Sequence, residues 1–256
     1  MTDYLPLLSR IPNEFRRGRN VYEGYQRGAF LDNGYLREQI QADPDFQDAI
    51  SYSENRSIVT ADRLMNLFLL MKFFVPRLPS GHLIEFGCYR GGSAFFLARL
   101  AAKFLPSARV FGLDTFEGMP STDASVDIHH AGQFADTSIE EVLAVKERFG
   151  LNNIHFVKGL FQDTAPALLQ NARSIVLAHI DCDIYEAVKY AYLVSKPYMV
   201  QMGYYVFDDA NAASCIGATE AVEDFVIRRD GLHSEQIFPH FVFRHPVKAF
   251  NETSNS

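Results

Sequence analysis

Pairs of aspartates follow two apolar runs of this 256-residue chain, at the points where buried strands would end. Asp181 comes directly after the run Ile175–Ile180, and Asp208 comes directly after the run Tyr204–Phe207. The carboxyl ends of neighbouring parallel strands face one crevice, so the carboxylates that follow them should converge there. Carboxylates held together repel one another unless a cation joins them. The spacing therefore predicts a cation site at this edge of the sheet.

An all-oxygen ligand set without cysteine or histidine favours Mg²⁺ or a similar hard ion. We expect Asp181, Asp208 and Asp209 to be the metal ligands. Asp183 lies two residues beyond Asp181 and could instead cap a helix that starts near Tyr185. Two such clusters at successive strand ends are more specific than a single aspartate, which would be unremarkable.

A glycine-rich turn follows another apolar strand, at residues 83–93. Glycines let a ligand approach the backbone closely, and the N-terminus of the following helix offers amide donors to an anionic group. A dinucleotide would require the G-x-G-x-x-G spacing, whereas the glycines here are Gly87, Gly91 and Gly92. Glu85 stands beside the turn, where it would repel a pyrophosphate and attract a cation. This charge pattern favours S-adenosylmethionine, which carries a sulfonium and an amino group next to a carboxylate.

Two later strand ends supply the remaining predicted cofactor contacts. Asp114 lies about 20 residues beyond the start of the helix, where an acid can accept hydrogen bonds from both ribose hydroxyls. Its alternative role is that of a helix cap or turn residue. Phe161 can border the adenine, and Gln162 can reach the adenine edge.

The elements that must position these residues alternate between strand and helix over residues 82–230. Short apolar runs leave room for helices with a helical stripe between them, as in a parallel sheet covered on both faces. Two further candidate strands, Gln236–Phe238 and Phe241–Arg244, read as a closing hairpin. The predicted fold class is α/β: a class I methyltransferase, Rossmann-like, doubly wound sheet of five parallel strands plus a C-terminal antiparallel hairpin.

The first 80 residues differ from the predicted catalytic domain, residues 81–250. Helices are predicted at Leu36–Gln47 and Ala61–Val75, the second strongly amphipathic. Aromatic residues lie among polar ones before and at the start of these helices: Tyr22, Tyr25, Phe30 and Tyr35. This helical extension is predicted to be either a cap facing the substrate or an arm that joins subunits, so a homo-oligomer is expected.

The composition excludes several classes of protein. A net charge of -7 offers no basic surface for a nucleic acid. Three cysteines without paired spacing suit a reduced, cytoplasmic protein. The start of the chain does not resemble a signal peptide, and the longest apolar run, Leu67–Val75, is too short to cross a membrane. Only the last residues, Asn251–Ser256, are expected to be disordered.

At these motifs the sequence resembles the macrocin O-methyltransferase family, whose members methylate sugar hydroxyls of macrolides and related natural products with S-adenosylmethionine and Mg²⁺. The resemblance covers roughly residues 56–247. It rests on residues 56–59, 85–93, 114–120, 159–166, 179–185 and 208–209 with the following Gly217. It implies a small-molecule sugar or glycoside acceptor, with a polysaccharide sugar or a catechol-like phenol as alternatives. It also adds Ser57, Gly87 and Tyr89 to the expected cofactor contacts.

The same positions are similar to those of the more distant catechol-type methyltransferases. That likeness implies Ser93 near the methionine carboxylate, Gln162 near the adenine, and Asp181, Asp208 and Asp209 as the metal triad. The catechol-type enzymes carry a lysine base three residues after the first metal aspartate, where this chain has Ile184. The identity of the base is therefore open.

The hypothesis is an in-line displacement in which the metal binds two neighbouring acceptor oxygens and lowers the pKa of one of them. Asp181 could take the proton, with His129 or His130 as the alternative. These histidines lie in a long connection, residues 116–137, that could form a lid over the acceptor or be disordered. A nicotinamide or nucleotide-sugar enzyme and a catalytically silent binding protein are the competing classes.

Overall fold

The computed structural model describes residues 15–16, 19–20 and 33–246, and it separates the chain into two compact units, residues 1–43 and 44–256. The first unit contains a two-stranded antiparallel pair and a short helical segment: β1 (Phe15–Arg16), β2 (Arg19–Asn20), η1 (Asn33–Tyr35) and α3 (Leu36–Ala42). Tyr22, Tyr25, Phe30 and the C-terminal residues 251–256 lie outside the described residues.

The helix predicted over residues 36–47 is wrong in one respect, because the structure contains two helices there. α3 ends at Ala42, and α4 (Pro44–Ile50) begins two residues later. Asp43 between them is extended, with φ −71° and ψ 122°. The residue before a proline is disfavoured in the helical region, so Pro44 ends the first helix and starts the second.

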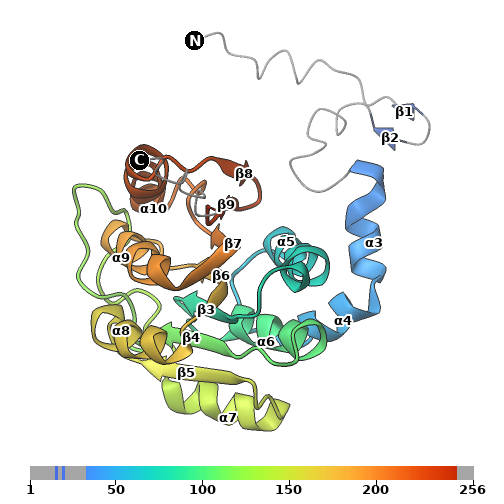
Figure 1. The fold of residues 1–256 in the computed structure, drawn as a ribbon, viewed down its shortest axis with the longest axis horizontal. Coiled ribbons are helices and arrows are strands. Elements are labelled where there is room, and N and C mark those ends of the chain that lie inside the picture. Colours follow the sequence, from blue (N-terminus) through green and yellow to red (C-terminus); the bar gives the residue numbers. More distant parts are fainter. Residues whose placement is uncertain (1–14, 17–18, 21–32, 247–256) are drawn as a thin grey trace, which may run out of the picture. The chain divides into compact units, whose positions relative to one another are not determined.

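The second unit is built on one sheet, in which the described residues form seven strands (Figure 1). The order across the sheet is β5-β4-β3-β6-β7-β9-β8, and the first five of these strands are parallel. Their bounds are β3 (His82–Phe86), β4 (Val110–Asp114), β5 (Ile154–Lys158), β6 (Ile175–Ile180) and β7 (Met199–Phe207). The direction in which the chain adds successive strands reverses at the centre, between β3 and β6, where ligands bind in such sheets. The predicted α/β class is confirmed.

The C-terminal hairpin is also confirmed, with a shift of its first strand. β8 (Ser234–Gln236) and β9 (Phe241–Arg244) pair antiparallel, and β9 inserts beside β7. The expected strand Gln236–Phe238 was too late in the chain, because Ile237 and Phe238 lie exposed in the connecting loop. Pro239, which follows them, cannot donate to a strand ladder.

Helices cover both faces of the sheet (Figure 1). One layer contains α5, α6 and α7, and the other contains α8, α9 and α10. Their bounds are α5 (Ala61–Leu69), α6 (Gly92–Phe104), α7 (Ile139–Phe149), α8 (Phe161–Ala172), α9 (Tyr185–Ser195) and α10 (Ile216–Ala221). Further helical segments continue three of these helices. They are η2 (Leu70–Phe74) and η3 (Val75–Arg77) after α5, η4 (Lys196–Tyr198) after α9, and η5 (Val222–Arg229) after α10.

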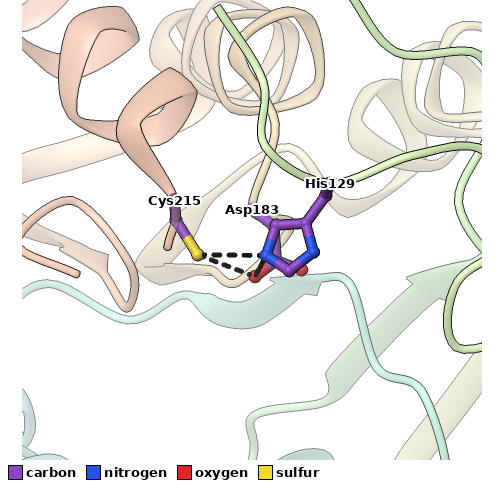
Figure 2. Close-up of side chains that lie close together, drawn as sticks. All are labelled: His129, Asp183 and Cys215. Carbon is purple, nitrogen blue, oxygen red and sulfur yellow. Dashed lines mark hydrogen bonds and ion pairs between the residues drawn. The ribbon is translucent and has the colours of Figure 1, made fainter. Parts of the chain in front are cut away.

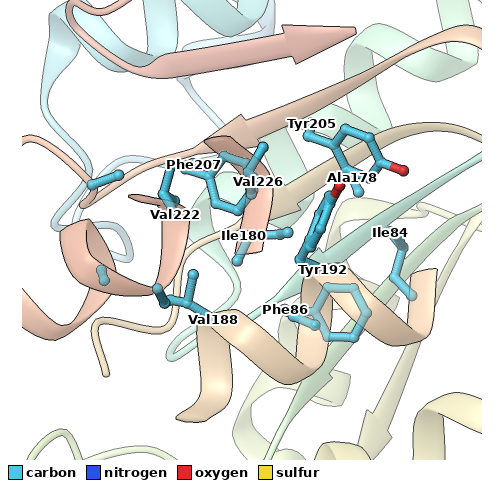
Figure 3. Close-up of a cluster of buried hydrophobic side chains, with 14 of the residues drawn as sticks. Ile84, Phe86, Ala178, Ile180, Val188, Tyr192, Tyr205, Phe207, Val222 and Val226 are labelled. Carbon is cyan, nitrogen blue, oxygen red and sulfur yellow. The ribbon is translucent and has the colours of Figure 1, made fainter. Parts of the chain in front are cut away.

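Alternate residues of the central strands form the core beneath α9 and α10 (Figure 3). Phe86 of β3, Ile180 of β6 and Phe207 of β7 all belong to this buried cluster. Side chains alternate between the two faces of a strand, so the neighbours of these residues point to the opposite face. Glu85 and His179 are such neighbours, and they lie side by side in the register of β3 and β6.

No helix among the described residues is both long enough and apolar enough to cross a membrane.

Candidate active site

A cavity of about 420 Å³ opens at the carboxyl ends of the parallel strands. Its wall includes ten of the predicted site residues: Ser57, Gly87, Tyr89, Ser93, Asp114, Phe161, Gln162, Asp181, Asp208 and Asp209. These residues are far apart in the sequence and come from the ends of the five parallel strands, from the segments that follow these strands and from the segment before α5. The fold therefore gathers most of the predicted cofactor and metal contacts around one space.

The glycine-rich turn packs against two other segments. Gly87 has a φ of +88°, and a Cβ there would overlap the carbonyl oxygen of Asp181. Gly92 begins α6, and a Cβ there would meet the backbone and side chain of Ser57 at 2.6 Å. A side chain at either position would push one of these segments away. The two glycines thus set the spacing between the turn, the first cluster aspartate and the segment before α5.

Asp114 at the end of β4 holds the turn in place. Its Oδ2 accepts the backbone N–H groups of Cys88 and Tyr89, each at 2.8 Å, and its Oδ1 accepts the N–H of Phe116 at 2.7 Å. A carboxylate oxygen has two lone pairs, so the two N–H groups use both lone pairs of Oδ2, whereas Oδ1 keeps acceptor capacity toward the cavity. The turn role and the ribose role that the sequence left as alternatives are compatible in this geometry.

Glu85, in contrast, does not line the cavity. Its side chain is fully buried, and its Oε1 lies 2.7 Å from Nδ1 of His179. The strand alternation that puts Phe86 in the core puts Glu85 on the other face, next to His179. The proposed attraction between Glu85 and a bound cationic cofactor therefore has no direct contact in this structure, and the residue acts within the buried network described below.

The three predicted metal ligands converge. Asp181, Asp208 and Asp209 each place a carboxylate oxygen within 4.8 Å of the others. Arg63 of α5 donates to Oδ2 of Asp208, and its Nη1 lies 3.4 Å from Oδ1 of Asp209. The other oxygen of Asp209, Oδ2, is buried without a hydrogen-bond partner. A buried carboxylate oxygen without a donor requires a ligand or a cation to satisfy it.

The charges around this cluster favour a divalent cation. Among the described residues, five carboxyl groups meet two cationic side chains, Arg63 and His179: Glu85, Asp181, Asp183, Asp208 and Asp209. Burial and the charge of Asp208 raise the pKa of Asp181 well above its usual range, and burial raises the pKa of Asp209. Carboxylates that repel one another in this way are stabilised when a metal ion binds them. The residues present therefore fit a hard divalent ion.

A buried polar network, which the sequence did not reveal, supports Asp208 from below. His240 in the loop before β9 is fully buried, and its Nε2 lies 2.8 Å from Oδ1 of Asp208. Asn66 of α5 directs its side-chain nitrogen at Nδ1 of His240 at 3.0 Å, while its oxygen accepts from Gln236 at 2.9 Å. Because the amide donates to Nδ1, the proton of His240 is on Nε2. His240 therefore donates to Asp208.

His179 completes this network. Its Nδ1 contacts Glu85, and its Nε2 lies 3.5 Å from Oδ1 of Asp208. Burial alone would lower the pKa of His179, but the carboxylates of Asp208 and Glu85 raise it to about 9. Burial would raise the pKa of Asp208, but the hydrogen bond from His240 and the positive charge of His179 hold it below its usual range. We call Glu85, His179, Asn66, Gln236 and His240 the floor network.

The structure places the remaining candidates, Asp183, His129 and His130, differently with respect to the cavity. Asp183 lines it, and the helix cap expected of Asp183 is not made: α9 begins after Ile184, and the N–H of Tyr185 donates to Asp127 instead. His129 does not line the cavity but lies 3.9 Å from Asp183. His130 is exposed, and its Nδ1 lies 3.2 Å from the carbonyl oxygen of the neighbouring Ala131.

The connection of residues 116–137 contributes another part of the cavity wall. Met119, Pro120 and Phe134 lie on the wall, and Asp127 ties this connection to the start of α9. A Cβ at Gly217 of α10 would overlap this Asp127 carboxylate. Gly217 was part of the motif that followed the second aspartate pair, and the structure gives its physical reason, because the glycine leaves room for Asp127.

Comparison with characterised proteins agrees with the fold and the motifs. The sequence model of the macrocin-O-methyltransferase (TylF) family matches residues 44–235. A 4'-O-methyltransferase of Streptomyces olivaceus that acts on 8-demethyl-8-(2,3-dimethoxy-alpha-L-rhamnosyl)-tetracenomycin-C is 29% identical over 232 residues, which cover 87% of this chain and 84% of the relative.

Solved structures show the same fold at lower identity. The O-methyltransferase NovP has a TM-score of 0.64 and 19% identity, over 78% of this chain and 88% of NovP. The calicheamicin methyltransferase CalS11 has a TM-score of 0.59 and 21% identity, over 79% of this chain and 93% of CalS11. With a match across three quarters of its length, the chain belongs to the macrocin-O-methyltransferase family and is an S-adenosylmethionine-dependent O-methyltransferase.

Proposed function

We propose that this enzyme transfers the methyl group of S-adenosylmethionine to a hydroxyl group of a sugar on a glycosylated natural product, and that it requires Mg²⁺ or a similar divalent ion. The observation that carries the proposal is the convergence of Asp181, Asp208 and Asp209 beside the cavity. The sugar assignment is supported by the family and by the relative that methylates a rhamnosyl group.

The cofactor end of the cavity is assigned to the glycine-rich turn. Ser93 is buried on the wall in the first turn of α6, where its hydroxyl and the free backbone N–H groups suit the methionine carboxylate. The remaining lone pair of Asp114, on Oδ1, suits a ribose hydroxyl. Phe161 and Gln162 begin α8 on the same wall and suit the adenine. Together these residues would fix the direction in which the sulfonium methyl group points.

The other end is assigned to the acceptor and the cation. Asp181, Asp208 and Asp209 would hold the ion, which when bound lowers the pKa of an acceptor hydroxyl and orients it. Arg63 pairs with Asp208 and Asp209, and it would remain beside the cluster as a positive charge when the ion is bound. Met119, Pro120 and Phe134 give this end an apolar border that suits the less polar face of a sugar or its aglycone.

We assign the removal of the proton from the acceptor hydroxyl to a carboxylate at the cation end of the cavity. Asp181 was the first candidate, but as a metal ligand it has less capacity left for a proton. Asp183 lines the cavity next to the cluster and is not one of the three gathered ligands. Burial raises the pKa of Asp183 to about 8. We therefore propose that Asp183 accepts this proton. Nε2 of His129 lies 3.9 Å from Oδ1 of Asp183.

Methyl transfer to a panel of glycosides tests the proposal. The purified enzyme is incubated with S-adenosylmethionine and rhamnosylated aromatic polyketides, free sugars or catechol, and methylated products are detected by mass spectrometry. We expect transfer to a glycoside, loss of transfer with a chelator, and recovery with Mg²⁺. Activity that is unchanged by the chelator would contradict the metal requirement, and transfer to catechol alone would contradict the sugar acceptor.

An aspartate variant separates the cation role from folding. Asp209→Asn should lower kcat/KM by more than about 100-fold, because a lost ligand costs more than the 10- to 100-fold typical of its supporting partners. Calorimetry with S-adenosylhomocysteine should still show binding. Asp48→Asn is the matched control, since Asp48 is an exposed carboxylate that pairs with Arg99 away from the cavity. Full activity of Asp209→Asn would remove the basis of the cation site.

A further inference from the structure

A second group of metal-ligand side chains lies at the rim of the cavity (Figure 2). Cys215, directly before α10, places its Sγ 3.3 Å from Oδ1 of Asp183 and 3.5 Å from Nε2 of His129. The same nitrogen and carboxylate oxygen are 3.9 Å apart. Cys215 is buried, while the side chains of His129 and Asp183 are 15% and 21% exposed. The group therefore combines a buried thiol with access from solvent.

The hydrogen bonds around His129 direct a lone pair at this group. Nδ1 of His129 lies 2.8 Å from Oε1 of Gln133, and the same oxygen accepts the backbone N–H of His130 at 3.0 Å. An oxygen that accepts from a backbone N–H also accepts from the imidazole, so Nδ1 carries the proton of a neutral ring. Nε2 is then an acceptor. Two acceptors, Nε2 of His129 and Oδ1 of Asp183, thus face one thiol proton.

The spacing of the three donor atoms matches that of a tetrahedral zinc site. Zinc lies about 2.3 Å from a thiolate sulfur, about 2.0–2.1 Å from an imidazole nitrogen and about 2.0–2.2 Å from a carboxylate oxygen. In a tetrahedron these bond lengths separate the donor atoms by roughly 3.4–3.6 Å. The observed separations of 3.3, 3.5 and 3.9 Å lie around these values. The contact of Gln133 with the other ring nitrogen is the supporting bond that zinc-binding histidines make.

We propose that His129, Asp183 and Cys215 form a binding site for a thiophilic divalent ion of the Zn²⁺ class beside the carboxylate cluster. This ion would occupy Asp183, the carboxylate to which the proposed function assigns the acceptor proton, so its binding would compete with methyl transfer. Binding breaks the S–H bond of Cys215, the thiolate ligates the ion, and the proton goes to solvent. Three protein ligands leave the fourth position to water. The bound ion joins the 116–137 connection to the segment after β6 and to the start of α10. Sulfur and imidazole ligands distinguish this site from the all-oxygen cluster.

Cobalt(II) is the probe, because a cobalt–thiolate bond absorbs strongly in the near ultraviolet and carboxylate ligands do not. The full-length protein is saturated with Mg²⁺ and titrated with Co²⁺. We expect a thiolate band that saturates at one ion per chain and disappears when Zn²⁺ is added. Cys215→Ser should abolish the band, and His129→Ala should weaken Co²⁺ binding at least about 10-fold.

Two further variants complete the experiment. Cys182→Ser should keep the band, because Cys182 is not among the three ligand residues. Asp209→Asn should also keep it, and this result holds whether or not the proposed methyl transfer requires Mg²⁺. Circular dichroism verifies that each variant is folded. Absence of the band in the unmodified protein, its persistence in Cys215→Ser, or its loss in Cys182→Ser would overturn the proposal.

Discussion

The two sides of the carboxylate cluster are built differently. Below Asp208, the floor network consists of side chains from β3, β6, α5 and the β8–β9 hairpin, with Glu85, His179 and His240 fully buried. At the rim, His129 and Asp183 come from connections and keep partial exposure. The packed helices and strands therefore orient the carboxylates of the cluster, whereas the connections control which ligands can reach them. Substitutions in the floor should therefore act on stability and cation affinity, and those at the rim on ligand choice.

The largest expected effect comes from the centre of the floor. His179→Ala removes the imidazolium between Glu85 and Asp208 and leaves two buried carboxylates with one opposing charge fewer. Breaking a buried charge pair costs about 3–5 kcal/mol, and we expect a loss of this size in the free energy of unfolding, measured with urea. His179→Gln keeps a hydrogen-bond donor and should lose less. Equal stability of His179→Ala and the unmodified protein would break the distinction between floor and rim.

A smaller effect is expected at the edge of the floor. His240→Ala removes the donor to Asp208, so the affinity for Mg²⁺ should fall about 10- to 100-fold while binding of S-adenosylhomocysteine is retained. Calorimetry with each ligand measures the two affinities. His245→Ala is the matched control, because His245 directly follows β9 and contacts the hydroxyl of Tyr205 in β7. Equal losses in both variants would mean that His240 has only a packing role.

The smallest effect is expected at the rim. His130→Ala should change neither kcat nor stability beyond the experimental error, since its imidazole is exposed and lies against a neighbouring backbone carbonyl. His129→Ala should lower kcat by less than about 10-fold, because removal of a true general base costs about 100-fold or more. Steady-state methyl transfer measures both. A loss above 100-fold in His129→Ala would assign the acceptor proton to His129 instead of Asp183.

The fold was largely predictable because its signals are local. Five apolar runs located the five parallel strands, and Ile175–Ile180 was predicted with the observed bounds. β7 was harder: only Tyr204–Phe207 was recognised, because its first half is partly exposed and contains Met202 at φ +63°. Likewise, the break at Pro44 depends on one residue within an otherwise helical pattern.

The sequence by itself determined the positions at which acids follow buried strands, and hence the carboxylate cluster and the glycine-rich turn. Strand ends are set by short-range hydrophobic patterns, and parallel strands bring their ends together. Only the tertiary structure decided that Glu85 is buried against His179 and does not line the cavity, that Arg63 reaches the cluster, and that His240 supports Asp208. Asn66 and His240, which contact one another, are 174 residues apart. Such contacts depend on strand register and helix packing, and no local pattern of residues encodes them.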